Sequence, residues 1–218
     1  MGIDMNFSKA PKNMLEHRSS TLKNFGYDNC TDSQYRFNAL GYRSDIEFVP
    51  RDDAVWFLGN SITFGIGLDL IHTFPGMVSQ QIEAPVYNFS WGCVAHTNLE
   101  YLEFVRSLLA VSRPRMIFYQ INNLDCYRQD GRIVLDKPVH LLEEEFRKFH
   151  ARLEAMMLGL QHKFLYWDNV RYDITLPNCL VDQKYQVDRS LPHDAATFGK
   201  KSHRLIALKI LDHLKSTC

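Results

Sequence analysis

The residues with the clearest chemical potential lie in the segment FLGNSITFGIG, residues 57–67, where an apolar run ends at Gly59, Asn60 and Ser61. A phosphate-binding loop would need G-x-x-x-x-G-K-[ST], but Gly59 and Gly65 are one residue too far apart and no lysine follows. A dinucleotide fingerprint lacks its third glycine here, and the α/β-hydrolase elbow G-x-S-x-G is only half matched. What remains is a serine on a tight turn after an apolar strand, which predicts either a nucleophile or a simple turn cap.

The stretch VWFLGNSITFGIGLD resembles the first block of the SGNH, or GDSL-type, esterase and lipase superfamily, G-D-S-x-T-x-G-x-G, with Asn60 in place of the usual aspartate. The resemblance implies that Ser61 is the nucleophile and that its backbone N–H also serves the oxyanion hole. It extends from about Arg36 to the C-terminus and includes RFNALGYRS, which is similar to an N-x-x-G-[FY]-R stretch of some members and contains Asn38 and Arg43.

Two further blocks follow predicted strands. In YNFSWGCVAHTN, Asn88 matches the first residue of the family's N-x-G-x-x-G, while counting puts Cys93 at the last glycine and Gly92 one place early, so either backbone N–H is a candidate oxyanion donor. In FYQINNLDCYR, the family's G-x-N-D lacks its glycine, and the amide of Asn122 or Asn123 is the third candidate donor, with Asn122 favoured. An amide donates a hydrogen bond without being able to take the substrate's proton.

A serine hydroxyl needs a general base within hydrogen-bond reach, and the family supplies it as D-x-x-H before the last helix. The corresponding segment is QVDRSLPHDAATFGKKSHRLIALKIL, in which two alignments compete. Matching the loop histidine makes His193 the base and Asp188 its carboxylate. Matching the helix puts Asp194 at the aspartate and Thr197 at the histidine, so either His193 has taken over the role or the base is lost. The second-choice bases or substrate contacts are His72 and His96.

The elements that would position these residues alternate along the chain. The segments AVWFLG, PVYNFS, RMIFYQIN and KFLYWD are short, apolar and ended by turn residues, as buried parallel strands are. Between and after them, apolar residues recur at helical spacing. These are Phe74, Met77, Val78 and Ile82; Leu99, Leu102, Val105 and Leu109; Leu142, Phe146, Phe149, Leu153 and Leu160; and Ile206, Ala207, Ile210 and Leu214.

This alternation predicts a three-layer α/β/α sandwich on a mostly parallel, flavodoxin-like sheet, with ligands outside the carboxyl ends of the strands. We expect residues 54–218 to form this α/β domain and residues 1–53 to form an irregular lead-in that packs on it.

Composition narrows the class of function. The 218 residues contain 25 Lys and Arg and 25 Asp and Glu, so the overall charge favours neither nucleic acid nor an anionic membrane as a partner. The five cysteines are scattered without metal-ligand or disulfide spacing, and no stretch approaches the about 20 apolar residues of a membrane helix. We therefore expect a cytoplasmic protein that acts on a small molecule, with no metal and no cofactor.

The function that the resemblance implies is hydrolysis of an ester by a Ser-His-Asp mechanism. The sequence has no long apolar lid, which favours a small acyl group such as acetate on a carbohydrate or another polar alcohol. Nearby aromatic residues, Phe64, Trp91, Tyr119 and Tyr127, are candidates to stack on a sugar ring or to fill the core. The alternatives are a catalytically silent binding or structural module that has lost its base, and an acyltransferase that uses the same serine.

Overall fold

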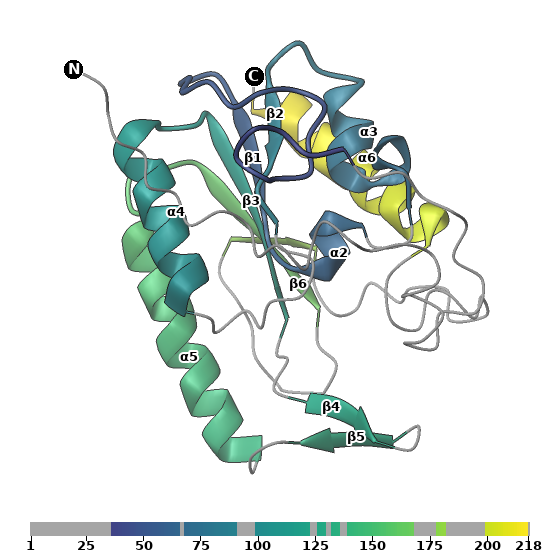
Figure 1. Ribbon diagram of the computed structural model, residues 1–218. Helices are drawn as coiled ribbons and strands as arrows, with labels where there is room; N and C mark the ends of the chain where they lie inside the picture. Colours follow the sequence, from purple (N-terminus) through teal and green to yellow (C-terminus); the bar gives the residue numbers. More distant parts are fainter. Residues whose placement is uncertain are drawn as a thin grey trace.

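The centre of the fold is a parallel β-sheet (Figure 1). The computed structural model describes residues 36–65, 68–90, 99–122, 126–129, 132–135, 139–167, 178–181 and 199–217. Within them, the sheet contains five strands in the order β2-β1-β3-β6-β7, and all of their pairings are parallel. The strands are β1 (Val55–Leu58), β2 (Val86–Asn88), β3 (Met116–Asn122), β6 (His162–Trp167) and β7 (Cys179–Val181). The four predicted strands are confirmed, and β7 is an addition.

The strand order creates a topological switch point beside β1. The chain passes from β1 to β2 on one side and then returns to β3 on the other side. The register pairs Phe57 with Asn88 and Leu58 with Tyr119, so the carboxyl ends of the three strands lie next to one another. In sheets of this order, the crevice outside the carboxyl ends at the switch point is the usual ligand site. The residues that follow β1 and β3 therefore occupy the position where chemistry is expected.

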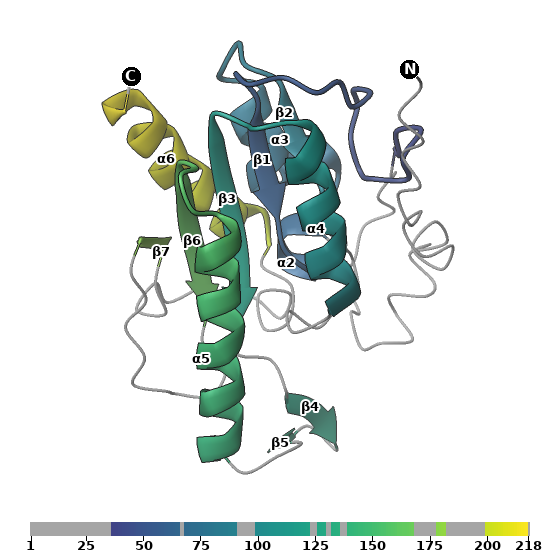
Figure 2. The same ribbon diagram turned by 90° about the vertical axis from the view of Figure 1, so that its left-hand side faces the viewer.

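Helices cover both faces of the sheet, so the predicted three-layer α/β architecture is confirmed (Figures 1 and 2). On one face, α4 (Leu99–Val111) and α5 (Val139–Met156) enclose an apolar cluster that includes Leu58, Val105 and Leu153. On the other face, α3 (Phe74–Ser79) and α6 (Lys200–Ser216) enclose a second cluster around Phe57. All four residues of β1 are buried, which explains their continuous apolar character.

Two of the predicted helical stripes extend too far. Helix α5 ends at Met156, and Leu160 lies beyond a turn that contains Gly159 at φ +78°. A glycine in the left-handed region ends the helical path, so the apolar residue after it packs on the core from a turn. Helix α3 ends at Ser79, and Ile82 packs against the second cluster from the connection to β2.

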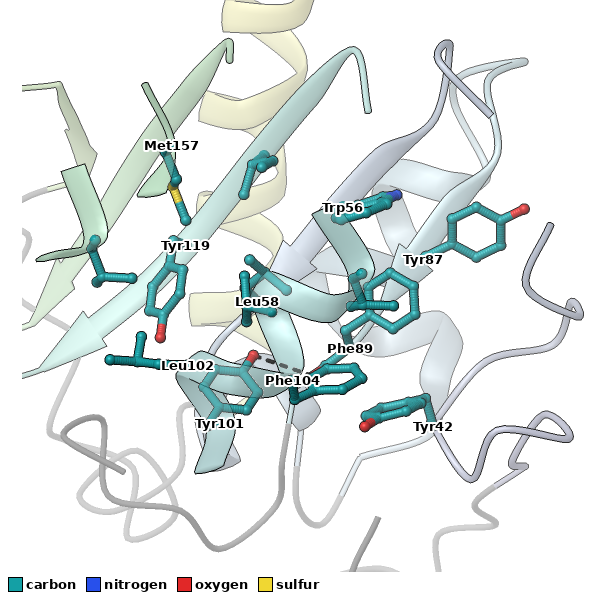
Figure 3. Close-up of a cluster of buried hydrophobic side chains, with 14 of the residues drawn as sticks. Tyr42, Trp56, Leu58, Tyr87, Phe89, Tyr101, Leu102, Phe104, Tyr119 and Met157 are labelled. Carbon is teal, nitrogen blue, oxygen red and sulfur yellow. Dashed lines mark hydrogen bonds between the residues drawn. The ribbon is translucent and has the colours of Figure 1, made fainter. Parts of the chain in front are cut away.

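The segment that precedes β1 packs against the first core cluster. The ring of Tyr42 is 1% exposed and stacks on Phe104 with 4.7 Å between ring centroids (Figure 3). Phe37 and Phe48 pack on the same cluster, and an isolated antiparallel bridge joins Phe37 to Arg43. Residues 36–50 contain no helix or extended strand.

A small hairpin interrupts the alternation of strands and helices. Its strands are β4 (Cys126–Gln129) and β5 (Arg132–Leu135), which pair antiparallel and follow β3 at the carboxyl edge of the sheet. The sequence analysis missed this hairpin, although Asp130 and Gly131 between the strands form the strongest short hairpin signal that a sequence offers. Within the described ranges, no helix has the length and apolar character needed to cross a membrane.

Candidate active site

The residues Gly59, Asn60 and Ser61, here called the serine turn, begin where β1 ends. The geometry of this turn requires a glycine at its first position. Gly59 has a φ of +149°, and a Cβ atom there would lie 2.6 Å from Thr63 Oγ1 and 2.8 Å from Gln120 Oε1. The Gly59 N–H donates a hydrogen bond to the hydroxyl of Tyr101 on α4 at 2.8 Å. The turn is therefore pressed against β3 on one side and tied to α4 on the other.

Ser61 is the first residue of α2 (Ser61–Phe64), a single helical turn. Asn60 is its N-cap, and the Asn60 side-chain oxygen accepts a hydrogen bond from the Ile62 N–H at 3.2 Å. The helix ends at Gly65, which has a φ of +75° and donates its N–H to the carbonyls of Ser61 and Ile62. Asn60, the residue that departs from the family motif, thus has the local role of starting this helix.

Ser61 is the point at which the turn reaches solvent. Of the twelve residues from Ala54 to Gly65, Ser61 alone is not buried. Its hydroxyl has no hydrogen-bond partner among the described residues. The serine is therefore presented at the carboxyl edge of the sheet, and the turn residues on both sides of it are fixed.

Side chains from β2 and β3 hold α2 in place. The Asn88 amide Nδ2 donates to the Thr63 carbonyl at 3.2 Å, and its Oδ1 accepts from the Ser90 N–H at 3.2 Å. The Gln120 amide Oε1 accepts from the Asn60 N–H at 3.0 Å and from the Thr63 hydroxyl at 3.2 Å. Sequence reasoning selected Asn88 from the family pattern but missed Gln120 altogether.

Arg43 closes the C-terminal end of α2. Its Nη1 donates to the carbonyls of Phe64 and Gly65 at 2.6 and 2.7 Å, and its Nη2 donates to the Leu68 carbonyl. The guanidinium lies over the Phe64 ring, 5.2 Å from the centroid, and the side chain is fully buried. A cation near the last carbonyls of a helix is stabilising, because these groups have no partner within the helix.

The loop that delivers Arg43 is the RFNALGYRS stretch. Asn38 Oδ1 accepts from the N–H groups of Leu40 and Tyr42 at 3.1 and 3.0 Å, and Gly41 turns the chain at φ +81°. The sequence alone indicates no role for this stretch. The structure shows that it folds into a compact turn from which the Arg43 side chain reaches the C-terminal end of α2.

His203 on α6 is fixed as a structural residue. Its Nδ1 accepts a hydrogen bond from the Phe74 N–H at 3.0 Å, and its ring stacks on that of Phe74. Burial, with a smaller contribution from Arg43, lowers the pKa of His203 to about 3. Because Nδ1 already accepts the hydrogen bond from the Phe74 N–H, this neutral imidazole caps the start of α3 and cannot use Nδ1 to activate a serine.

Other described histidines lie elsewhere. His162 is the first residue of β6, and His150 on α5 lies near it across Glu154. Strands β1 and β6 run parallel, so the start of β6 is at the opposite edge of the sheet from Ser61. His72 lines a groove of about 560 Å³ between α3 and α6, together with Lys200 and other side chains.

Several predicted site residues fall outside the described residues. These are His193, Asp188, Asp194, Gly92, Cys93 and Asn123, together with Thr197 and His96. Asn122 is the last residue of β3, so its backbone is at the carboxyl edge of the sheet. Of the aromatic candidates, Phe64 and Tyr119 are fully buried and belong to the core, which is the second of the two roles expected for them. In the described part of the chain, no group of three or more His, Cys, Asp or Glu side chains is arranged to hold a metal ion.

Comparisons with known proteins find similar solved structures at low identity. No protein-family model and no curated protein matches the sequence. One similar solved structure is a carbohydrate esterase whose active site is described as having divergent catalytic and non-catalytic binding functions; it is 11% identical, covers 78% of this chain and 67% of its own, and has a TM-score of 0.46.

A second similar structure is a carbohydrate esterase family 2 enzyme with a carbohydrate-binding domain from Corynascus thermopiles (Myceliophthora fergusii). It is 12% identical, covers 78% of this chain and 70% of its own, and has a TM-score of 0.41. The α/β assignment of this chain rests on its own strand order and helix layers.

Proposed function

We propose that this chain is a serine esterase that hydrolyses esters of a small acyl group, with Ser61 as the nucleophile. The observation that carries the proposal is the exposure of Ser61 alone in the buried segment Ala54–Gly65, at the carboxyl end of β1. That position adjoins the switch point between β1 and β3, where sheets of this order bind ligands.

In this mechanism Ser61 Oγ attacks the ester carbonyl and His193 accepts the serine proton. His193 then passes the proton to the leaving alcohol, while Asp188 or Asp194 holds the imidazole in the required tautomer. The support for His193 is its place in the loop before α6 in the sequence. The fixed, neutral state of His203 favours a base from that loop over one from α6 itself.

The tetrahedral intermediate would be stabilised by three donors. They are the N–H of Ser61, an N–H from Gly92 or Cys93, and the amide of Asn122 or Asn123. The support is the order of the chain, because these residues follow β1 and β2 or stand at or just after the end of β3, and the carboxyl ends of the three strands are neighbours. Removing one such donor typically costs about 100- to 1000-fold in kcat.

The proposed substrate is an acetate or similarly small acyl ester of a carbohydrate or another polar alcohol. The reaction needs no cofactor, because serine, histidine and amide donors suffice for acyl transfer. Hydrolysis of p-nitrophenyl acetate, compared with the butyrate and octanoate esters, measures the acyl preference. The proposal expects kcat/KM to fall as the acyl chain lengthens.

Covalent labelling with a fluorophosphonate probe tests the nucleophile directly. We expect the wild-type protein to be labelled and Ser61→Ala to be inert, with a loss of esterase kcat of at least about 1000-fold. Ser79→Ala is the matched control, because Ser79 is an exposed serine on α3. A wild-type protein that is neither labelled nor active would contradict the proposal and support the silent binding module.

A further inference from the structure

Gln120 occupies the central strand next to the serine turn. Its side chain is 1% exposed, and β3 lies between β1 and β6 in the sheet. The register pairs Leu58 with Tyr119, so Gln120 is level with Gly59, the first residue of the turn. A long polar side chain at this buried position needs a reason, because most buried amides in proteins are held by hydrogen bonds.

The Gln120 amide has a defined orientation. One of its atoms faces the Asn60 N–H at 3.0 Å and the Thr63 hydroxyl at 3.2 Å. A backbone N–H can only donate, so this atom is the amide oxygen Oε1. The amide nitrogen Nε2 is buried without a hydrogen-bond partner in the described part of the chain. The oxygen, and not the nitrogen, is therefore the atom that binds the turn.

Gln120 and Gly59 also fit against each other in shape. A Cβ atom on Gly59 would lie 2.9 Å from Gln120 Cβ and 2.8 Å from Gln120 Oε1. The turn backbone thus lies directly on the glutamine side chain. Its two hydrogen bonds hold the residue before Ser61 and the residue two positions after it.

We propose that Gln120 is a positioning residue that fixes the direction of the Ser61 side chain by anchoring both sides of it to the central strand. This role rests on the proposed esterase function. Gln120 is not a catalytic residue, because its buried amide is not available to the substrate. Its effect reaches the reaction through the backbone of Asn60 and the side chain of Thr63.

The test uses Gln120→Met, which keeps the length of the side chain and removes the acceptor. We expect kcat and the rate of fluorophosphonate labelling to fall about 10- to 100-fold, because a displacement of about 1 Å at the nucleophile has an effect of this size. KM should stay within about threefold, because substrate binding is not altered. Ile210→Val on α6 is the control for a general loss of stability, since Ile210 is fully buried in the second core cluster.

Thr63→Val supplies an independent variant of nearly the same shape. It removes the hydroxyl donor and leaves the Asn60 N–H bonded to Gln120, so we expect a smaller loss of kcat than for Gln120→Met. The double variant should be no slower than Gln120→Met alone, because the Thr63 hydroxyl acts through the same oxygen. If the losses of kcat in the two single variants added up in the double variant, Thr63 would not act through Gln120, and the proposed anchoring of both sides of Ser61 by Gln120 would be overturned.

Hydrogen exchange gives a readout that needs no activity. We expect the Asn60 amide to exchange at least about tenfold faster in Gln120→Met and at the wild-type rate in Ile210→Val. If the wild-type protein is active and Gln120→Met keeps its kcat, the positioning role is overturned while the esterase stands. If the wild-type protein is inert toward probe and ester, the esterase proposal fails, and this role fails with it.

Discussion

The Phe74 N–H donates a hydrogen bond to His203 Nδ1 at 3.0 Å, and this bond joins α6 to the start of α3. The two rings also stack, with 5.2 Å between their centroids. The contact uses the histidine lone pair that a general base would need, and it explains why a histidine in the first turn of α6 is structural. It also makes the stability of the fold depend on pH.

We predict that stability falls as the pH drops below about 6.5. The pKa of His203 is about 3 in the folded protein and near 6.5 in the unfolded chain, so between these values the unfolded state binds more protons. The contribution of neutral His203 to the free energy of unfolding is complete above pH 6.5. As the pH falls toward 3, this contribution decreases by at most about 1.4 kcal/mol per pH unit. Urea unfolding at a series of pH values measures this slope.

His203→Asn isolates the effect, because the asparagine Oδ1 can accept from the Phe74 N–H but does not titrate. The slope between pH 6.5 and 4 should be shallower in this variant than in the wild-type protein. His72→Asn serves as the control at a half-buried histidine. Equal slopes in His203→Asn and the wild-type protein would show that protonation of His203 does not govern the acid sensitivity.

Gly59→Ala should destabilise the fold far more than Gly159→Ala. The new Cβ would lie 2.6 Å from Thr63 Oγ1 at a φ of +149°, so we expect a loss of about 3 kcal/mol or more. Gly159→Ala is the matched control, since its φ is +78° and no atom lies within 4 Å of the added Cβ. Backbone strain alone should cost about 1 kcal/mol there. Similar losses in urea unfolding would contradict the close approach at Gly59.

How far the sequence could predict this structure depends on the kind of contact. The strands β1 and β3 were recognisable because buried parallel strands are continuous apolar runs, and the turn at Ser61 was recognisable because it directly follows such a run. The place of Arg43 was not, because its carbonyl partners lie 21 to 25 residues away and no local pattern encodes them. A motif marks a residue, and only the fold supplies its partner.

Gln120 illustrates the same limit. When Asn122 is matched to the asparagine of G-x-N-D, Gln120 stands at the position of the glycine, and the sequence alone gives no role for it. The hydrogen bonds of Gln120 connect β3 to a turn about 60 residues earlier in the chain, as the separation of Gln120 from Asn60 shows. A long amide at the position where the pattern has glycine is visible in the sequence, but its meaning depends on the neighbouring turn that the amide contacts.

Arg43→Met should destabilise the fold by about 3 kcal/mol or more. The change removes donors to the carbonyls of Phe64, Gly65 and Leu68 and leaves these buried acceptors without them. The stability of Arg43→Lys should lie between that of the wild-type protein and that of Arg43→Met, because a single ammonium cannot reproduce the fork of a guanidinium. Arg106→Met is the control at an exposed ion pair with Glu103 and should change stability by no more than about 0.5 kcal/mol. If urea unfolding gave equal losses of stability for Arg43→Met and Arg106→Met, the hydrogen bonds of Arg43 would not be the source of the stabilisation.

Two buried tyrosines on the same core cluster offer the sharpest comparison (Figure 3). The Tyr101 hydroxyl accepts from the Gly59 N–H at 2.8 Å and donates to the Phe89 carbonyl at 3.2 Å. The Tyr119 hydroxyl is buried without a hydrogen-bond partner among the described residues, and burial raises the pKa of both phenols. Their rings lie 6.2 Å apart, so the same substitution is tested in nearly the same surroundings.

Tyr101→Phe should therefore cost about 1–3 kcal/mol, because it leaves a buried N–H and a buried carbonyl without their partner. Tyr119→Phe should change stability by less than about 0.5 kcal/mol or increase it, because it removes a hydroxyl that is desolvated and gains nothing in return. Only Tyr101→Phe should also slow the labelling of Ser61, because only Tyr101 holds the glycine that begins the serine turn. Urea unfolding and labelling rates of the two variants, measured side by side, distinguish a hydroxyl that supports the turn from one that merely fills the core.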